Sequence, residues 1–277
     1  MRPAILLLSA LVGGAKLPPA AHADTLTLDG TEIVLVHDHG AIERRGAEVV
    51  GTRLELPRHG VLEIRGASRD AAARFDDLWL YQLQGEQGPV CEPDANGDTR
   101  ALLFPGHIDQ ALRYHADARR FSLSCVSGVQ AKCLRWGYRP WARAPLTGES
   151  LAPYYEACLR LARADYCGND QPTTRDGTTI DVYDEVGVQQ SDDSIEGMEF
   201  EAGWASTGAV CVAHSRIPEH LDLADLPARC PRLAPADLGV ACTASSAKAR
   251  GAILFNRSAH GKKPEVRTPD MPAVSIR

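Results

Sequence analysis

The chain has little of what marks several large classes of protein. Only 6% of its 277 residues are aromatic, and 36 acidic residues outnumber 30 basic ones. This acidic balance argues against a nucleic-acid partner, because such proteins need a surplus of Lys and Arg against the phosphates. No C-x-x-C pair, G-x-S-x-G, H-E-x-x-H or Gly-rich phosphate loop occurs. We therefore expect no metal ion and no cofactor.

One apolar run stands out, and it lies at the start of the chain. Arg2 precedes the run Ala4–Val12, and Ala21-His22-Ala23 follows as a small-x-small cleavage site. The run is too short to cross about 30 Å of hydrocarbon. We predict a signal peptide over residues 1–23, export to the periplasm or the medium, and no membrane span once the signal is removed.

The cysteines support export. There are eight, and all lie beyond the predicted signal, at Cys91, Cys125, Cys133, Cys158, Cys167, Cys211, Cys230 and Cys242. An even number in an exported chain points to disulfides, here up to four. Sequence alone does not choose among the roughly one hundred possible pairings. Cys230 with Cys242 is the favoured local pair, because Pro231 and Pro235 suit a compact turn between them.

Alternating apolar residues predict strands along most of the chain, so the expected fold class is α+β with mostly antiparallel sheet, stabilised by disulfides. Phe121–Val126 and Ala131–Tyr138 are predicted to form a hairpin about Ser127-Gly128. One amphipathic helix is expected over about residues 151–166, ended by Gly168. The predicted parts are a signal peptide over 1–23, a strand-rich part over 24–90, a disulfide-bonded domain over 91–258 and a loose tail over 259–277.

The middle of the chain carries a set of spaced motifs between Lys132 and Cys230, and Ala164-Asp165-Tyr166-Cys167 is its centre. Its other members are Lys132–Trp141, Ala157–Arg160, Thr174–Thr178, Phe200–Ala202 with Trp204, and Gly208–Val212. The set resembles the ADYC-domain family of exported bacterial proteins, which is named for its four-residue motif. The resemblance implies a bacterial origin and export, and it implies no particular activity.

Asp165 falls on the apolar face of the predicted helix, in register with Cys158 and Leu161. A buried carboxylate at this position needs an Arg or the backbone N–H groups of the following loop as partners. We favour a structural carboxylate that holds the loop after Cys167. The alternative is an exported hydrolase that uses Asp165, Cys167 and His214, and it requires Cys167 to be a free thiol.

Basic side chains accompany the motif on the helix and in the segment before it. Arg160 is expected on a solvated face of the helix, paired with Glu156 four residues earlier. The segment before the helix interleaves basic residues with aromatic ones, which gives either a packed corner or an exposed platform for a sugar ring or an anionic envelope polymer. We favour packing, and the candidate binding residues are Trp136, Tyr138, Trp141 and Arg139.

The leading functional hypothesis is an exported, disulfide-bonded protein that acts as a binding or structural module at or outside the cell envelope. Its expected partners are a glycan, an envelope polymer or another envelope protein. The hydrolase is the alternative, and it ranks second because the sequence holds no assembled catalytic signature.

Overall fold

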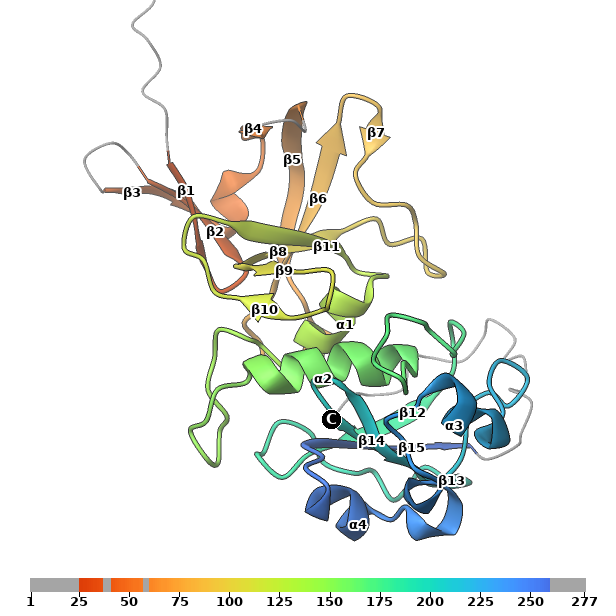
Figure 1. The fold of residues 1–277 in the computed structure, drawn as a ribbon. Helices are drawn as coiled ribbons and strands as arrows, with labels where there is room; N and C mark the ends of the chain where they lie inside the picture. The colour runs from red at the N-terminus through yellow and green to blue at the C-terminus, as the bar shows by residue number, and fades with distance from the viewer. Residues whose placement is uncertain (1–24, 37–40, 57–59, 260–277) are drawn as a thin grey trace, which may run out of the picture.

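The computed structural model describes residues 25–36, 41–56 and 60–259. In Figure 1 the described chain forms two groups of strands with helices between them. We call residues 25–125 the N-terminal half and residues 129–259 the C-terminal half. The predicted signal peptide over 1–23 and all but the first residue of the predicted tail over 259–277 lie outside the described residues.

Antiparallel strands build the N-terminal half. They are β1 (Thr25–Asp29), β2 (Glu32–Val36), β3 (Ile42–Arg45), β4 (Arg53–Leu56), β5 (Gly60–Arg69), β6 (Trp79–Gly85), β7 (Gly88–Pro89), β8 (Ala101–Pro105), β9 (His107–Ile108), β10 (Tyr114–His115) and β11 (Phe121–Cys125). β1, β2 and β3 form one sheet, β11-β8-β6-β5-β4 form a second with β7 paired to β6, and β9 pairs with β10. Gly30 adopts φ +60° in the turn between β1 and β2, a conformation that glycine reaches without strain.

The central strands of the second sheet are buried on both faces. Along β8, Leu102 and Phe104 pack into a cluster that includes the helices, whereas Ala101 and Leu103 pack into a cluster with the strands of the first sheet. Successive side chains of a strand point to opposite faces, so alternate residues of β8 serve two cores. One apolar cluster therefore runs from β8 through the helices into the C-terminal half.

Two helices of the C-terminal half lie between the two groups of strands, and both correct the sequence analysis in part. The segment 131–138, predicted as a strand, is helical instead over α1 (Val129–Arg135). Its apolar residues turn toward the second helix, to which Cys133 is disulfide-bonded, so packing outweighs their alternation. The second helix, α2 (Ala152–Arg163), is the predicted one, but Ala164 ends it with φ 50° four residues before Gly168.

A four-stranded antiparallel sheet forms the base of the C-terminal half. Its strands are β12 (Ile180–Tyr183), β13 (Met198–Ala205), β14 (Gly208–Val212) and β15 (Leu254–Ala259), in the order β12-β15-β13-β14. α2 packs on one face of this sheet. Two short helices complete the half, α3 (Leu226–Arg229) and α4 (Ala244–Ala249). α4 lies on the opposite face, where Ala247 packs so close to Gly203 of β13 that no side chain fits there. The fold is α+β with mostly antiparallel sheet, as predicted.

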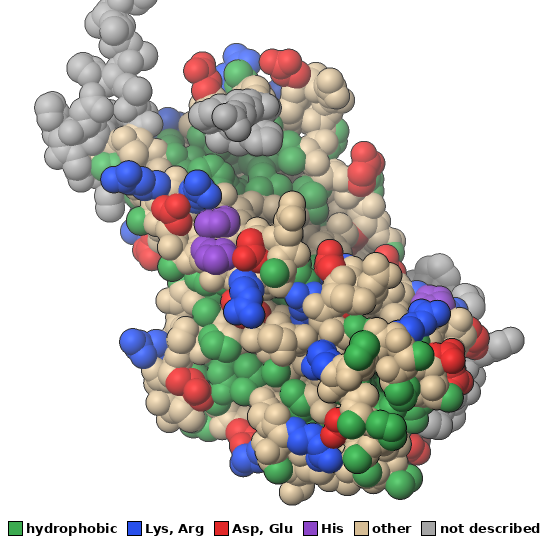
Figure 2. Space-filling model, viewed as in Figure 1, with side chains coloured by type: hydrophobic (Ala, Val, Ile, Leu, Met, Phe, Trp, Pro, Cys, Tyr) green, Lys and Arg blue, Asp and Glu red, His purple; other side chains and the backbone are tan. Residues whose placement is uncertain are grey.

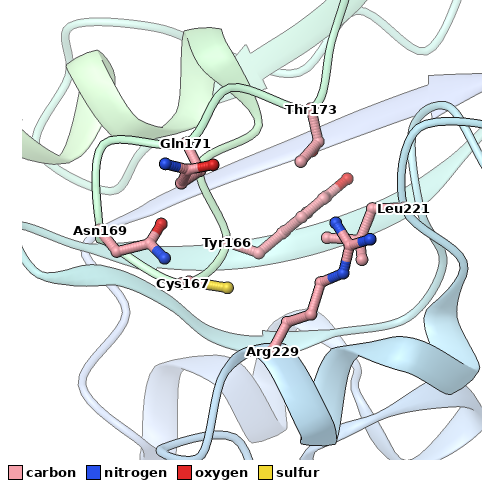
Figure 3. Close-up of a pocket in the computed structure, with 7 residues that line it drawn as sticks. All are labelled: Tyr166, Cys167, Asn169, Gln171, Thr173, Leu221 and Arg229. Carbon is pink, nitrogen blue, oxygen red and sulfur yellow. The ribbon is translucent and has the colours of Figure 1, made fainter.

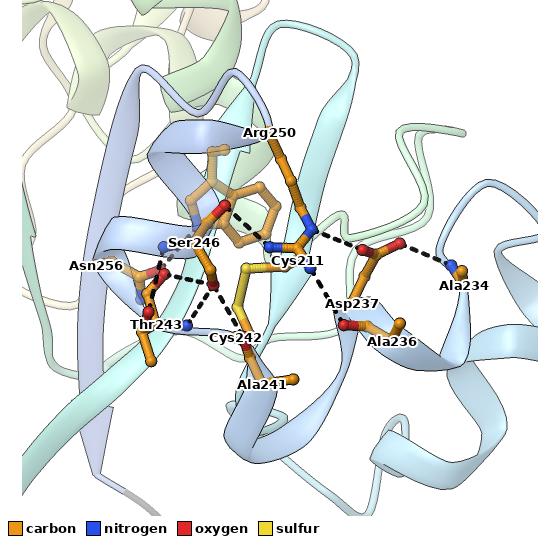
Figure 4. Close-up of a disulfide and its surroundings, with 11 residues drawn as sticks. Cys211, Ala234, Ala236, Asp237, Ala241, Cys242, Thr243, Ser246, Arg250 and Asn256 are labelled. Carbon is orange, nitrogen blue, oxygen red and sulfur yellow. Dashed lines mark hydrogen bonds and ion pairs between the residues drawn. A yellow bond between two sulfur atoms is a disulfide. The ribbon is translucent and has the colours of Figure 1, made fainter.

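All eight cysteines of the chain are paired. The disulfides are Cys91–Cys125, Cys133–Cys158, Cys167–Cys230 and Cys211–Cys242. The predicted local pair Cys230–Cys242 is therefore wrong. α3 carries Cys230 to the loop after α2, while Cys242 lies beside β14, so each cysteine finds a partner far away in the sequence. Figure 4 shows Cys211–Cys242 next to the start of α4, where Thr243 and Ser246 cap the helix and Arg250 pairs with Asp237 at 2.7 Å.

Within residues 25–36, 41–56 and 60–259, no helix is long and apolar enough to span a membrane.

Candidate functional site

The four-residue motif forms the turn that follows α2. Ala164 takes the left-handed conformation at the helix end, and its N–H donates to the carbonyls of Arg160 and Leu161. The hydroxyl of Thr173 donates to the Ala164 carbonyl at 2.6 Å and so folds the loop 164–173 back onto the helix end. Ala164 is buried and packs in the core.

Asp165 is completely buried and holds this loop from inside. Its carboxylate accepts hydrogen bonds from the Arg160 guanidinium at 2.5 Å and from the N–H groups of Asn169 at 3.1 Å and Asp170 at 3.0 Å. Both kinds of partner expected from the sequence are present. Arg160 itself was misplaced by the helix pattern: it is buried, not solvated, and also donates to the Ala111 carbonyl at 2.6 Å. Its expected partner Glu156 instead accepts the N–H of Tyr114.

Tyr166 leads into a buried polar network that the sequence analysis did not find. Its hydroxyl donates to Glu201 of β13 at 2.9 Å and accepts the N–H of Arg216 at 2.9 Å. The Arg216 guanidinium donates to both carboxylate oxygens of Glu201, at 2.9 and 3.0 Å, and to the carbonyls of Leu161 and Ala162. Asn256 donates to Glu201 at 2.7 Å from β15. We call Tyr166, Glu201, Arg216 and Asn256 the buried polar network.

Charges in this network stabilise each other. Burial by itself raises the pKa of Glu201, but the Arg216 guanidinium outweighs this effect and holds that pKa below its ordinary value. Burial raises the pKa of the Tyr166 hydroxyl far above its usual range, so the phenol keeps its proton. The network therefore acts as a fixed ion pair with a neutral phenol, and it ties the end of α2 to the sheet.

Cys167 completes the motif through its disulfide to Cys230. In this form Cys167 has no thiol, and the hydrolase hypothesis requires one. Arg232 holds the same turn, donating to the carbonyls of Cys167 at 3.0 Å and Tyr166 at 2.5 Å. His214, the third residue of that hypothesis, lies with its ring nitrogens 3.2 and 3.5 Å from the carbonyls of Ser215 and Glu199.

A pocket opens directly over the motif (Figure 3). Its volume is about 190 Å³, and it is lined by Tyr166, Cys167, Asn169, Gln171, Thr173, Leu221 and Arg229. Asn169 and Gln171 reach it from the loop after α2, and Arg229 reaches it from α3 on the other side. These three side chains are exposed and form no hydrogen bond or ion pair with another described residue. The polar groups at the bottom of the pocket are thus hydrogen-bonded within the protein, whereas the polar side chains at its rim are free.

The aromatic and basic segment lies elsewhere, around the end of α1. Tyr138 is buried and donates its hydroxyl to Asp184 at 2.9 Å. Arg139 pairs with Asp77 and lies 4.6 Å above the Phe75 ring. Both residues make packing contacts, as the favoured interpretation expects.

The two tryptophans of that segment are partly buried. Trp141 stacks on Phe104 of β8 with ring centroids 6.2 Å apart. The Trp136 carbonyl accepts a hydrogen bond from Gln189 at 2.6 Å. Ligand binding at Trp136 or Trp141 stays a prediction.

Sequence reasoning gave no role to Glu201, which it included only within the motif Phe200–Ala202, and it missed Arg216 and Arg229. Glu201 sits where the register between β13 and β15 shifts between Phe200 and Ala202, and this irregularity turns a charged residue inward. Strand alternation does not reveal such a bulge. Asp184 was missed as well; its carboxylate accepts the N–H groups of residues 186–189 and so fixes the loop after β12. Its signal was an Asp followed by a Gly three positions on, a common turn pattern.

These features define a disulfide-bonded α+β protein whose central motif is a structural turn beneath a small pocket with polar side chains at its rim. The sequence model of the ADYC domain matches residues 46–218, and the chain belongs to the ADYC domain family. Neither a search of curated proteins nor a search of solved structures finds a match. The family match extends across residue 90, and the predicted division of the chain at residues 90 and 91 stays a prediction.

Proposed function

We propose that this chain is an exported, disulfide-bonded binding module that acts at or outside the bacterial cell envelope, through the pocket over its ADYC motif. One observation carries the proposal. The side chains of Asn169, Gln171 and Arg229 converge on the pocket without a partner among the described residues, above a floor whose polar groups are engaged. Free polar groups gathered around a hollow are what a ligand of matching chemistry needs.

Export is supported by the cysteines and by the start of the chain. Four disulfides join all eight cysteines, and disulfides of this kind persist in oxidising compartments such as the periplasm and the medium. The first residues have the order of a signal peptide, with Arg2, an apolar run and a small-x-small site.

The lining favours a small, acidic, hydroxyl-rich ligand. The Arg229 guanidinium matches a carboxylate with two parallel hydrogen bonds. The amides of Asn169 and Gln171 both donate and accept, as sugar hydroxyls require, and Leu221 adds an apolar surface. A volume of about 190 Å³ has room for on the order of six waters, which is the scale of one sugar residue rather than of a large cofactor. An acidic sugar of an envelope glycan fits these conditions.

Isothermal titration of the exported protein tests the proposal, with oligogalacturonides and soluble peptidoglycan fragments as acidic probes and maltotriose as the neutral one. We expect an acidic probe to bind, maltotriose to bind at least tenfold more weakly, and Arg229→Gln to lose at least tenfold in affinity. Arg119→Gln is the matched control, because Arg119 is exposed and lies in the N-terminal half. Equal binding by both variants would place the ligand elsewhere.

The other hypotheses are separate outcomes of the same titration. Binding that survives Arg229→Gln but is lost on changing Trp141→Ala would favour the aromatic platform. Turnover of a probe, lost in His214→Ala, would favour the hydrolase. If no probe binds and the chain co-purifies with an envelope protein, it is a structural partner of that protein.

A further inference from the structure

A pair of histidines lies outside the pocket and the motif, on the small hairpin β9–β10. His107 and His115 are directly opposite each other in the register of the two strands. Their rings stack with centroids 4.9 Å apart and planes inclined by 19°. Figure 2 shows histidine side chains, drawn in purple, at the surface of one face of the molecule. The apolar packing of the core does not require imidazoles at this exposed hairpin.

Asp109 orients one ring of the pair. Its carboxylate lies 2.8 Å from His115 Nε2 and accepts the N–H groups of Ala111 and Arg113, so the turn between the strands fixes the carboxylate. A carboxylate accepts hydrogen bonds, so this contact engages Nε2 of His115 and leaves the other ring nitrogen, Nδ1, for a further partner.

The other ring carries an unsatisfied nitrogen. His107 Nδ1 is buried and has no hydrogen-bond partner among the described residues. A buried polar atom without a partner is uncommon in a folded protein and points to a bound water or ion. Because the two rings are neighbours, an ion at their shared edge would bind this nitrogen and a nitrogen of His115 together once the stacked rings turn apart.

From this geometry we infer that His107 and His115 form a two-histidine site for a divalent transition metal, with Asp109 as the positioning residue of His115. Imidazole pairs suit Cu²⁺, Ni²⁺ and Zn²⁺, with Cu²⁺ bound most tightly, and they do not suit Ca²⁺ or Mg²⁺. A ligating histidine commonly gives its other N–H to a carboxylate, as His115 does to Asp109. The sequence analysis expected no metal, because residues 107 and 115 come together only through the hairpin register.

The site is bidentate, and water completes the coordination. Among the described residues, no group of three or more His, Cys, Asp or Glu side chains gathers in a way that could enclose a metal. The stacked rings have to turn apart to share one ion, and the His115 side chain, about half exposed, has the space to turn. The site therefore captures a metal on the surface rather than building a closed structural centre.

Titration of the full exported chain without an affinity tag tests this inference, with CuCl₂, NiCl₂, ZnCl₂ and MgCl₂ as the probes. We expect Cu²⁺ to bind at one site, Ni²⁺ and Zn²⁺ to bind more weakly, and Mg²⁺ not to bind. His107→Asn and His115→Asn should each lower the Cu²⁺ affinity at least tenfold. His220→Asn is the matched control, because His220 is exposed in the C-terminal half, and it should leave the affinity unchanged.

Two further readouts keep the test decisive. The electron paramagnetic resonance spectrum of the Cu²⁺ complex should show coupling to two nitrogens in the wild type and to one in His115→Asn. Asp109→Asn should lower the affinity by roughly tenfold or more, because the ring loses its orienting carboxylate. If His115→Asn, a change at an exposed position, binds Cu²⁺ as tightly as the wild type, the inference is wrong. If this metal test fails, the proposed sugar-binding function still stands, because its pocket shares no residue with the hairpin.

Discussion

The two halves of this protein are held together by different interactions. In the N-terminal half, paired strands satisfy most of their own backbone hydrogen-bonding groups. This half has one disulfide, Cys91–Cys125. The C-terminal half has three disulfides and two completely buried carboxylates, Asp165 and Glu201. The difference follows from the backbone: the segments after α2 and after β14 begin in the interior, at residues 164–166 and 214–217, where they belong to no strand.

Arginines take the place of strand pairing in those segments. Arg216 binds the carbonyls at the end of α2, and Arg232 binds those of Tyr166 and Cys167. A guanidinium offers five donors and can cap several carbonyls at once, whereas a strand partner offers one donor per peptide group. Because each buried guanidinium needs a counter-charge, Arg160 and Arg216 come with Asp165 and Glu201. The ADYC motif is part of this system of irregular backbone, charges and disulfides.

The largest expected effect comes from breaking the buried polar network. Glu201→Leu leaves the Arg216 guanidinium buried without its partner, so we expect the free energy of unfolding to fall by about 3–5 kcal/mol. Urea denaturation measures it. The double variant Glu201→Leu with Arg216→Met removes both charges and should recover part of the loss. A single variant that costs less than about 1 kcal/mol would show that the network is not a main support of the C-terminal half.

Removing the motif disulfide should have the next largest effect. Cys167 and Cys230 are separated by 63 residues, and loss of this link through Cys167→Ser with Cys230→Ser should cost about 2–4 kcal/mol, because the unfolded chain gains freedom. The matched variant is Cys91→Ser with Cys125→Ser, which opens a separation of 34 residues. We expect it to cost less, since the N-terminal half relies on its strands. The reverse order in thermal unfolding would contradict the contrast between the halves.

Acid should weaken the C-terminal network in a defined direction. The pKa of Glu201 in the folded protein lies below its usual value of 4.5. The stabilisation is therefore complete above that value and is lost as the pH falls through the folded-state pKa. The difference in unfolding free energy between the wild type and Glu201→Gln should be large at pH 6 and shrink toward pH 3, as urea titrations at each pH will show. An unchanged difference would mean that Glu201 does not titrate in this way.

A smaller effect is expected from a single hydrogen bond in the N-terminal half. Thr31 is completely buried, and its hydroxyl accepts the N–H of Trp79 at 2.7 Å. Thr31→Val keeps the shape but leaves that N–H unsatisfied, so the unfolding free energy should fall by about 1–3 kcal/mol. Thr27→Val is the control, because Thr27 is exposed on β1 and should change stability little. Equal losses would show that burial of Thr31 does not matter.

The smallest effect on stability is expected at the rim of the pocket. Arg229 is exposed and has no partner among the described residues, so Arg229→Gln should change the unfolding free energy by less than about 0.5 kcal/mol. The proposed function still requires this variant to lose its acidic ligand. A large loss of stability would show that Arg229 belongs to the structural system of the C-terminal half after all.

The sequence by itself determined the features that depend on local order. The even cysteine count indicated disulfides, the three- and four-residue spacing located α2, and alternation located the strand that begins at Phe121, which is β11. The motif residues were recognised, and the need of Asp165 for an Arg or N–H partners followed from its place on an apolar helix face. Each of these inferences uses residues that are close in the chain, where spacing translates directly into geometry.

Tertiary structure alone decided the rest. The partner of Cys230 lies 63 residues away rather than at Cys242, and Glu201 meets Tyr166 and Arg216 only because a register shift in β13 turns its side chain inward. The pocket combines the loop after α2 with α3, and the paired histidines meet through a hairpin register. Such contacts depend on how separate elements pack. The free energy that favours them comes from the whole core rather than from any one segment.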